Sequence, residues 1–383
     1  MFELVLKGGR VVDPFRNFDQ VADVAFLHGR VAAVEPELAA SRATSVVDVA
    51  GRIVTPGLID LHTHVYWGGT SLGVDADAIA RRSGTTTFVD AGSAGPGNFL
   101  GFRKHVMEHA RTRILAYLNI SFAGIYGFSK NVMVGENTDI RLCDPREVVA
   151  CAKDHLDRLV GVKVRVGRIA SGANGAGPFN AALEAAEKLQ IPLMTHLDYP
   201  PPARHEVVPH LRRGDVLTHC FKPFPNAPVD GRGRIRPDVL AARERGVIFD
   251  IGHGMGSLAF ETASAMLEQG FLPDVISSDV HALCVDGPAY DLLATMSKFL
   301  ALGMRLEDVI RTTTQEPAKA INRSDDLGSL AVGAAGDASV LELRRGHYTH
   351  VDSVGEQLTA SEHLFCDGLV VGGAWWPNDR VAA

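Results

Sequence analysis

The stretch GRIVTPGLIDLHTH, residues 51–64, decides the fold of this chain. It is an apolar run that ends in His62 and His64, two histidines separated by one residue. Alternate residues of a strand point to the same face, so both imidazoles should project together where the strand ends. In a barrel that face can be the interior, where both rings could reach one metal ion. Taken alone, the pair is more typical of histidines that make hydrogen bonds in a polar pocket than of metal ligands.

Apolar runs alternate with helical segments over the middle of the chain. Counting the end of the opening stretch, the runs are GLIDLHTH, TTTFVDAG, RILAYLNIS, LVGVKVRVG, IPLMTHLD, DVLTHC, VIFDIGHG and DVISSDVH. Several of the helical segments end at a glycine, which is a common helix stop. Eight such pairs in roughly 270 residues match a (β/α)8 TIM barrel, whose active site lies at the carboxyl ends of the strands. We therefore predict an α/β fold with a catalytic barrel over residues 56–324.

Both ends of the chain show the shorter alternation of β structure. Near the start stand ELVLKGGRVV and DVAFLHGRVAAVE, and near the end stand DASVLELR and EHLFCDGLVVGGAWW. Neither end alone has enough strands to be stable. We predict that residues 1–55 and 325–383 combine into one small β-sandwich.

The composition is that of an ordinary soluble globular protein, with 46% hydrophobic and 22% charged residues among 383. The net charge of −7 comes without a basic stripe, which argues against nucleic-acid and membrane partners. No signal peptide and no apolar stretch of about 18 residues is apparent. The five cysteines are scattered, as is typical of free thiols in a reducing compartment. We therefore expect a cytoplasmic protein.

A lysine stands in the fourth apolar run, where a barrel strand would bury it. Lys163 is flanked by valines, and burial of its ammonium is costly unless the group is neutralised or paired. Burial lowers the pKa of a lysine, and a neutral amine can add carbon dioxide to form a carbamate. The two oxygens of a carbamate could bridge two cations. An ion pair between Lys163 and a neighbouring carboxylate is an equally good interpretation of this residue alone.

Three further ionisable residues end later runs. His196 and His219 close the fifth and sixth runs, each directly after a threonine, and Asp279 closes the eighth. One such histidine is more often a core residue, but two in matching positions, after the histidine pair and the lysine, indicate a metal site. Asp279 supplies the carboxylate expected beside a metal-bound water, although an aspartate at a strand end is also a common helix N-cap.

This order of residues resembles the binuclear subtype of the amidohydrolase superfamily. TPGLIDLHTH is similar to the first-strand signature of the dihydroorotase-like and hydantoinase-like branch, and GSLAVGAAGDASVLEL resembles the return of the chain into the terminal sandwich. LVGVKVRVG, THLDYPP, LTHCFKP, FDIGHGMGS and ISSDVHA most resemble a group of bacterial deacetylases. Members of that group are associated with acetyl-(R)-mandelate and N-acetyl-D-amino acids as substrates.

The resemblance implies a ligand set. One metal would be held by His62, His64 and Asp279, a second by His196 and His219, and carboxylated Lys163 would bridge both together with a hydroxide. Two divalent cations lower the pKa of bound water and polarise the carbonyl that it attacks. Asp279 would take the proton and deliver it to the leaving group. Imidazole-rich ligation favours zinc, although manganese, iron and cobalt also fit.

Four neighbours are candidates for binding substrate. Arg165 shares the face of the lysine two residues before it and could hold a substrate carboxylate, or form an ion pair with a loop aspartate. His253, among glycines, could contact substrate or support a metal ligand. Tyr126 could stabilise the oxyanion, as a loop tyrosine does in hydantoinases, or pack the loop. His281 follows Asp279 by two residues and could orient it.

The predicted function is that of a metal-dependent hydrolase that removes an acetyl group from a small carboxylate-bearing molecule. Hydrolysis of a cyclic amide, as in dihydroorotase or hydantoinase, is the alternative enzyme activity, and a non-catalytic scaffold of the same fold is the alternative from another class. The expected partner is a small-molecule substrate. Barrels of this kind often form dimers or larger rings, and the sequence carries no interface signal of its own.

Overall fold

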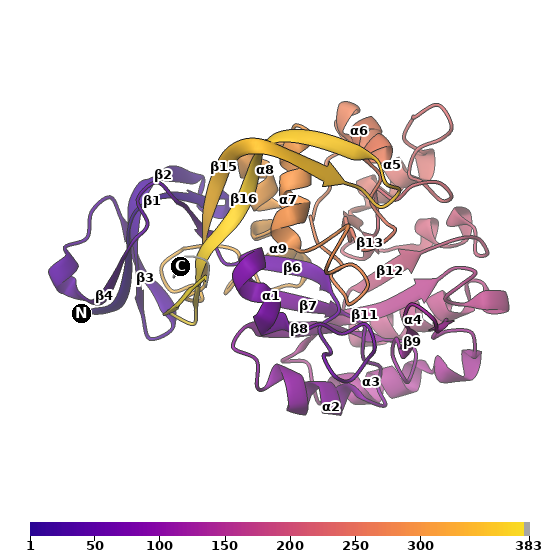
Figure 1. The fold of residues 1–383 in the computed structure, drawn as a ribbon. Helices are drawn as coiled ribbons and strands as arrows, with labels where there is room; N and C mark the ends of the chain where they lie inside the picture. Colours follow the sequence, from indigo (N-terminus) through magenta and orange to yellow (C-terminus); the bar gives the residue numbers. More distant parts are fainter. Residues whose placement is uncertain (379–383) are drawn as a thin grey trace.

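The computed structural model describes residues 1–378. A barrel of parallel strands ringed by helices stands beside a sheet that both ends of the chain build (Figure 1). The α/β architecture predicted from the alternating runs is therefore confirmed. The domain limits of 1–55, 56–324 and 325–383 remain a prediction.

Seven parallel strands form the barrel sheet, and each is paired with the next in the chain. They are β6 (Leu58–Thr63), β7 (Thr85–Ala91), β8 (Arg113–Asn119), β11 (Leu159–Val166), β12 (Leu193–Leu197), β13 (Val216–Thr218) and β14 (Ile248–Phe249). Each of the first five spans five to eight buried or nearly buried residues, as a strand covered on both faces requires. Their carboxyl ends therefore meet at one end of the barrel.

The eighth predicted strand closes the barrel without becoming an extended strand. Two isolated parallel bridges, Asp250 with Val275 and Thr63 with Val280, join this segment to its neighbours on either side. Asp279 has a φ of 49°, a left-handed backbone conformation that interrupts the strand. The Asp279 N–H nevertheless donates to the His62 carbonyl at 2.7 Å, which ties the last segment to the first strand.

The helices cover the outside of the barrel and follow the strands. They are α1 (Ala76–Ser83), α2 (Phe99–Phe102), α3 (Pro145–Lys153), α4 (Gly177–Leu189), α5 (Pro237–Arg245), α6 (Phe260–Glu268), α7 (Leu292–Ala301), α8 (Leu306–Arg311) and α9 (Gln315–Ala320). The α1 and α5 helices end at Gly84 and Gly246, both left-handed, as the glycine stops in the sequence predict. None of the helices within residues 1–378 has the length and hydrophobicity that crossing a membrane requires.

The second sheet joins the two ends of the chain. In order its strands are β17 (Ala374–Pro377), β16 (Gln357–Val371), β15 (Ala338–Val351), β5 (Ile53–Pro56), β1 (Phe2–Asp13), β2 (Phe18–Leu27) and β3 (Arg30–Glu35), with β4 (Ala43–Asp48) paired to β1. The antiparallel pairing of β5 with β15 joins the N-terminal to the C-terminal half. The long β15–β16 hairpin continues beyond this sheet and arches over α7 (Figure 1).

Candidate metal centre and active site

The carboxyl ends of the barrel strands surround a cavity of about 250 Å³. Seven of the ten residues predicted for the site line it: His62, His64, Arg165, His196, His219, Asp279 and His281. They come from β6, β11, β12, the turn after β13 and the closing segment, so they are up to 219 residues apart in the sequence. Lys163 lies close behind this lining, with its Nζ 3.3 Å from His62 Nε2.

Three of these residues form a group that could hold a metal ion. The ligand atoms of His62, His64 and Asp279 all lie within 4.8 Å of one another. Asp279 Oδ1 is 3.4 Å from His62 Nε2 and 3.3 Å from His64 Nε2. This oxygen is buried and has no hydrogen-bond partner in the described part of the chain, although buried polar atoms are normally paired. A cation shared with the two imidazoles would satisfy it.

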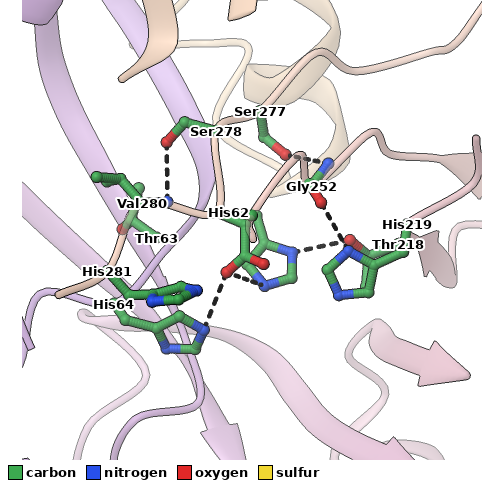
Figure 2. Close-up of polar contacts among 12 residues, drawn as sticks. His62, Thr63, His64, Thr218, His219, Gly252, Ser277, Ser278, Val280 and His281 are labelled. Carbon is green, nitrogen blue, oxygen red and sulfur yellow. Dashed lines mark hydrogen bonds and ion pairs between the residues drawn. The ribbon is translucent and has the colours of Figure 1, made fainter. Parts of the chain in front are cut away.

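Each of three imidazole rings is oriented by an oxygen at Nδ1. The partners are Thr218 Oγ1 for His62 at 2.8 Å and the Gly252 carbonyl for His219 at 2.7 Å (Figure 2). For His64 the partner is Ser93 Oγ at 2.8 Å. A ring that donates from Nδ1 keeps a lone pair on Nε2, which is the arrangement of a metal-binding histidine. His219 Nε2 is buried and has no hydrogen-bond partner among the residues that the structure describes, so its lone pair could bind a cation.

Two buried aspartates hold the hydroxyls that orient these rings. Thr218 Oγ1 donates to Asp250 Oδ2 at 2.6 Å, and Ser93 Oγ donates to Asp90 Oδ2 at 2.7 Å. These four residues were not predicted from the sequence. The signal that could have found them is that the second and seventh apolar runs also end in an aspartate, in FVDAG and FDIGHG.

The backbone around the candidate ligands is unusual. His219 and Asp279 have φ angles of 60° and 49°, in the left-handed region that L-residues other than glycine rarely occupy. Such conformations persist where the surrounding structure enforces them, often at functional sites. Gly252, with a φ of 49°, lets the backbone approach closely, because a Cβ there would lie 2.8 Å from His219 Nδ1. The Gly254 backbone packs in the same way against the Asp279 carboxylate.

Lys163 is completely buried, and within residues 1–378 no carboxylate forms an ion pair with it. Its Nζ instead lies near His62 Nε2 and 3.4 Å from Met194 Sδ. Burial lowers the pKa of Lys163 to about 8. The ion-paired lysine weighed from the sequence is therefore not observed in the described part of the chain.

Burial also sets the charge of the other site groups. It lowers the pKa of His64 to about 3 and raises that of Asp279 to about 6. The pKa values of His62, His196 and His219 are likewise lowered, mainly by burial and further by the neighbouring cationic groups. Neutral imidazoles are what metal binding requires, because the ligand nitrogen must be unprotonated. His196 lies beside His219, with the ring centroids 4.3 Å apart.

Arg165 reaches the cavity while it is held by a buried acid. Its Nε donates to Glu136 Oε1 at 2.9 Å, so the structural ion pair weighed from the sequence exists, with a glutamate in place of an aspartate. The guanidinium also lies 5.1 Å from the Phe128 ring centroid. A second cationic side chain, Lys222, was missed in the sequence although it follows His219 closely. It lines the cavity, and its Nζ donates to the Leu197 carbonyl at 2.9 Å.

The remaining predicted residues lie differently. His281 lines the cavity beside His64, with ring centroids 6.0 Å apart. His253 does not line it, and its Nε2 lies 2.6 Å from Lys298 Nζ. Tyr126 is 45% exposed and is also outside the lining. Phe128 and Met133, from the small β9–β10 hairpin (Gly127–Phe128 and Met133–Val134), line the cavity instead.

Comparison with known proteins gives the family. The model of the amidohydrolase family matches residues 258–373. A deacetylase from Agrobacterium fabrum is 36% identical over 350 residues, which cover 90% of this chain and 84% of that protein. A deacetylase from Enterococcus faecalis is 30% identical over 98% of this chain and all of its own. The chain belongs to the amidohydrolase family.

Solved structures agree with this assignment. An adenine deaminase superposes with a TM-score of 0.91 and 29% identity, covering 99% of this chain and 100% of its own. A dihydroorotase superposes with a TM-score of 0.89 and 32% identity, covering 98% and 99%. Family membership identifies this amidohydrolase as a metal-dependent hydrolase, in agreement with the resemblance seen in its motifs. The relatives carry three different names, so the family alone does not identify the substrate.

Proposed function

We propose that this amidohydrolase is a binuclear metal-dependent deacetylase that acts on a small carboxylate-bearing molecule. The substrate would be an N-acetyl-D-amino acid or an acetylated 2-hydroxy acid such as acetyl-(R)-mandelate. The main support for this proposal is the group of His62, His64 and Asp279, which lies in a cavity that Arg165 and Lys222 also line. Two relatives that align over most of the chain and are named deacetylases support removal of an acetyl group.

The nitrogen and oxygen donors of the cavity suit two divalent cations, with zinc favoured. His62, His64 and Asp279 would hold one cation, and His196 and His219 the other. The unpartnered His219 Nε2 and Asp279 Oδ1 support this assignment. When bound, the cations would lower the pKa of a water molecule and polarise the carbonyl of the substrate.

Lys163 is proposed to join the two positions as a carbamate. The neutral Nζ would attack the carbon of CO2, form an N–C bond and release one proton, leaving an anionic group with two oxygens. Its lowered pKa increases the fraction of neutral amine near neutral pH. A carbamate would also supply negative charge where the surrounding imidazoles are neutral, and two cations need such compensation.

Asp279 is proposed to move the proton. Its carboxylate would accept a proton from the attacking water and pass it to the departing amine or alcohol, while acetate leaves. The backbone of Gly254 packs against this carboxylate and fixes its position. Arg165 and Lys222 would bind the substrate carboxylate, because both are cationic groups on the cavity wall. His281 would help to orient Asp279, whereas His253 and Tyr126 lie outside the cavity lining.

Cyclic-amide hydrolysis is the second candidate activity. The similar dihydroorotase structure, with a TM-score of 0.89, supports it. Both reactions begin with attack of water on a carbonyl carbon, so the same ligand set would serve either.

The test is a metal analysis of the purified protein, combined with an acetate-release assay. The substrates are N-acetyl-D-amino acids, their L counterparts, acetylated 2-hydroxy acids and dihydroorotate. Paired variants are His64→Asn, in the metal group, and His109→Asn, an exposed histidine of the outer surface. About two metals per chain, with acetate released from one enantiomer and lost only in His64→Asn, is the expected result. Ring opening alone would transfer the assignment to a cyclic amidase, and a folded protein without metal or turnover would overturn both.

A further inference from the structure

A second cavity, of about 370 Å³, lies between α7 and the β15–β16 hairpin. It is lined by Lys298 of α7, by Tyr348 and His350 of β15, by His363 of β16 and by Arg82 of α1. None of the residues that line it also lines the metal-site cavity. Figure 1 shows the hairpin arching over α7, and residues of both elements line the cavity.

Lys298 is a buried cation whose partners are uncharged. It is 1% exposed, and its Nζ lies 2.6 Å from both the Pro288 carbonyl and His253 Nε2. Burial lowers its pKa to about 7. The carboxylates of Asp352 and Asp291 act on this charge, but among the described residues neither forms an ion pair with Lys298. An anion in direct contact with the ammonium would further offset the cost of its burial.

Two histidines of the hairpin present unused polar atoms at the same place. His350 Nε2 and His363 Nδ1 are buried and have no hydrogen-bond partner among residues 1–378, and His350 is only 6% exposed. The two rings are stacked, with centroids 5.3 Å apart and an interplanar angle of 20°. Burial, with a contribution from the charge of Lys298, lowers both pKa values to about 4. Both rings are therefore neutral near pH 7, and each can donate one N–H.

The charges around the cavity favour an anion over a cation. Asp291 is the carboxylate of the lining, and its Oδ2 lies 3.5 Å from Arg82 Nε, so these two charges offset each other. Lys298 is then the surplus charge of the lining, and the buried carboxylate of Asp352, outside the lining, also acts on it. We propose that this cavity is a second binding site, which takes a small oxyanion, a carboxylate or phosphate group, on Lys298, His350 and His363. The proposal does not depend on the reaction at the metal site.

The test uses histidine-selective ¹³C NMR on the full-length, metal-loaded protein. Phosphate and acetate are added separately, with chloride at matched ionic strength as the reference. His350→Phe and His363→Phe identify the two ring signals. We expect both signals to shift and saturate within about 20 mM anion, a range that covers weak millimolar binding. Saturation by phosphate alone or by acetate alone would identify the group that binds.

Variants show whether the contacts named here hold the anion. Lys298→Met keeps the shape of the side chain and removes its charge, so the apparent Kd should rise at least about tenfold. His363→Phe, in a less buried position, should also weaken binding. His347→Phe is the matched control, because His347 is an exposed residue of β15, in the same hairpin but outside the lining, and the Kd of this variant should equal that of the native protein. No saturable shift with either anion, or an unchanged Kd in Lys298→Met, would overturn the proposal.

Discussion

Replacement of Gly252 by alanine tests whether the backbone holds the proposed metal ligands in place. Gly252 accepts a hydrogen bond from His219 Nδ1 through its carbonyl and has a φ of 49°. An added Cβ would lie 2.5 Å from Thr218 Oγ1 and 2.8 Å from His219 Nδ1. The substitution therefore presses at once on His219 and on the hydroxyl that orients His62.

The size of the effect follows from these distances. Ordinary contacts of a Cβ begin at 3.4 Å, so His219 and the Thr218 hydroxyl must retreat by roughly 0.6–0.9 Å. Metal–ligand distances tolerate only about 0.2 Å. Displacement of groups that orient ligands typically lowers metal affinity by about 10–100-fold, and we expect a loss in that range. The left-handed backbone adds a folding cost of about 1–2 kcal/mol for a residue with a Cβ.

The assay is competition for zinc between the protein and a chromophoric chelator, with thermal unfolding measured in parallel. Gly256→Ala is the matched control, because Gly256 lies in the same loop, has no left-handed φ and would bring its Cβ within 4 Å of nothing. The control should bind zinc as the native protein does. If a folded Gly252→Ala variant bound zinc as tightly as Gly256→Ala, the claim that this loop positions metal ligands would be refuted.

Three further predictions concern buried charges. Reconstitution of the native protein in CO2-depleted buffer should load about one metal per chain, and added bicarbonate should restore about two. Bicarbonate should not change the metal content of Lys163→Met, and equal loading of the native protein in both buffers would contradict a carbamate. Arg165→Met leaves the buried Glu136 unpaired and should cost about 3–5 kcal/mol of unfolding free energy in denaturant titrations. The double variant Arg165→Met, Glu136→Gln should regain most of the lost unfolding free energy. Its KM should rise more for carboxylated than for uncharged substrates, and an equal rise would show that Arg165 does not recognise the substrate carboxylate. The pKa of Lys298 is lowered from 10.5 to about 7, so the unfolded chain binds this proton more tightly than the folded chain. The difference in unfolding free energy between the native protein and Lys298→Met should therefore rise by more than about 1 kcal/mol from about pH 7 to pH 10. A difference that does not change with pH would show that Lys298 titrates normally.

The location of the candidate site was predictable because it depends on local patterns. Parallel strands that carry polar residues at their carboxyl ends bring those residues to one end of a barrel, whatever the details of packing. His196 lies near the end of its strand and His219 directly follows the end of the next, one residue beyond the register partner of His196, and the structure puts both in the cavity lining. Tyr126 and His253 lie on irregular segments, where no strand periodicity fixes the direction of a side chain, and neither reaches the lining.

The sequence by itself determined the alternation of strands and helices, the joining of the two chain ends into one sheet, and the positions along the chain of the candidate metal ligands. These follow from hydrophobic period and residue type, which are local properties. Only the tertiary structure decided that Glu136 holds Arg165, that Asp250 and Thr218 orient His62, and that the last barrel segment closes by single bridges. Each of these depends on groups that are dozens to hundreds of residues apart, and a sequence pattern contains no distance between such groups until the chain has packed.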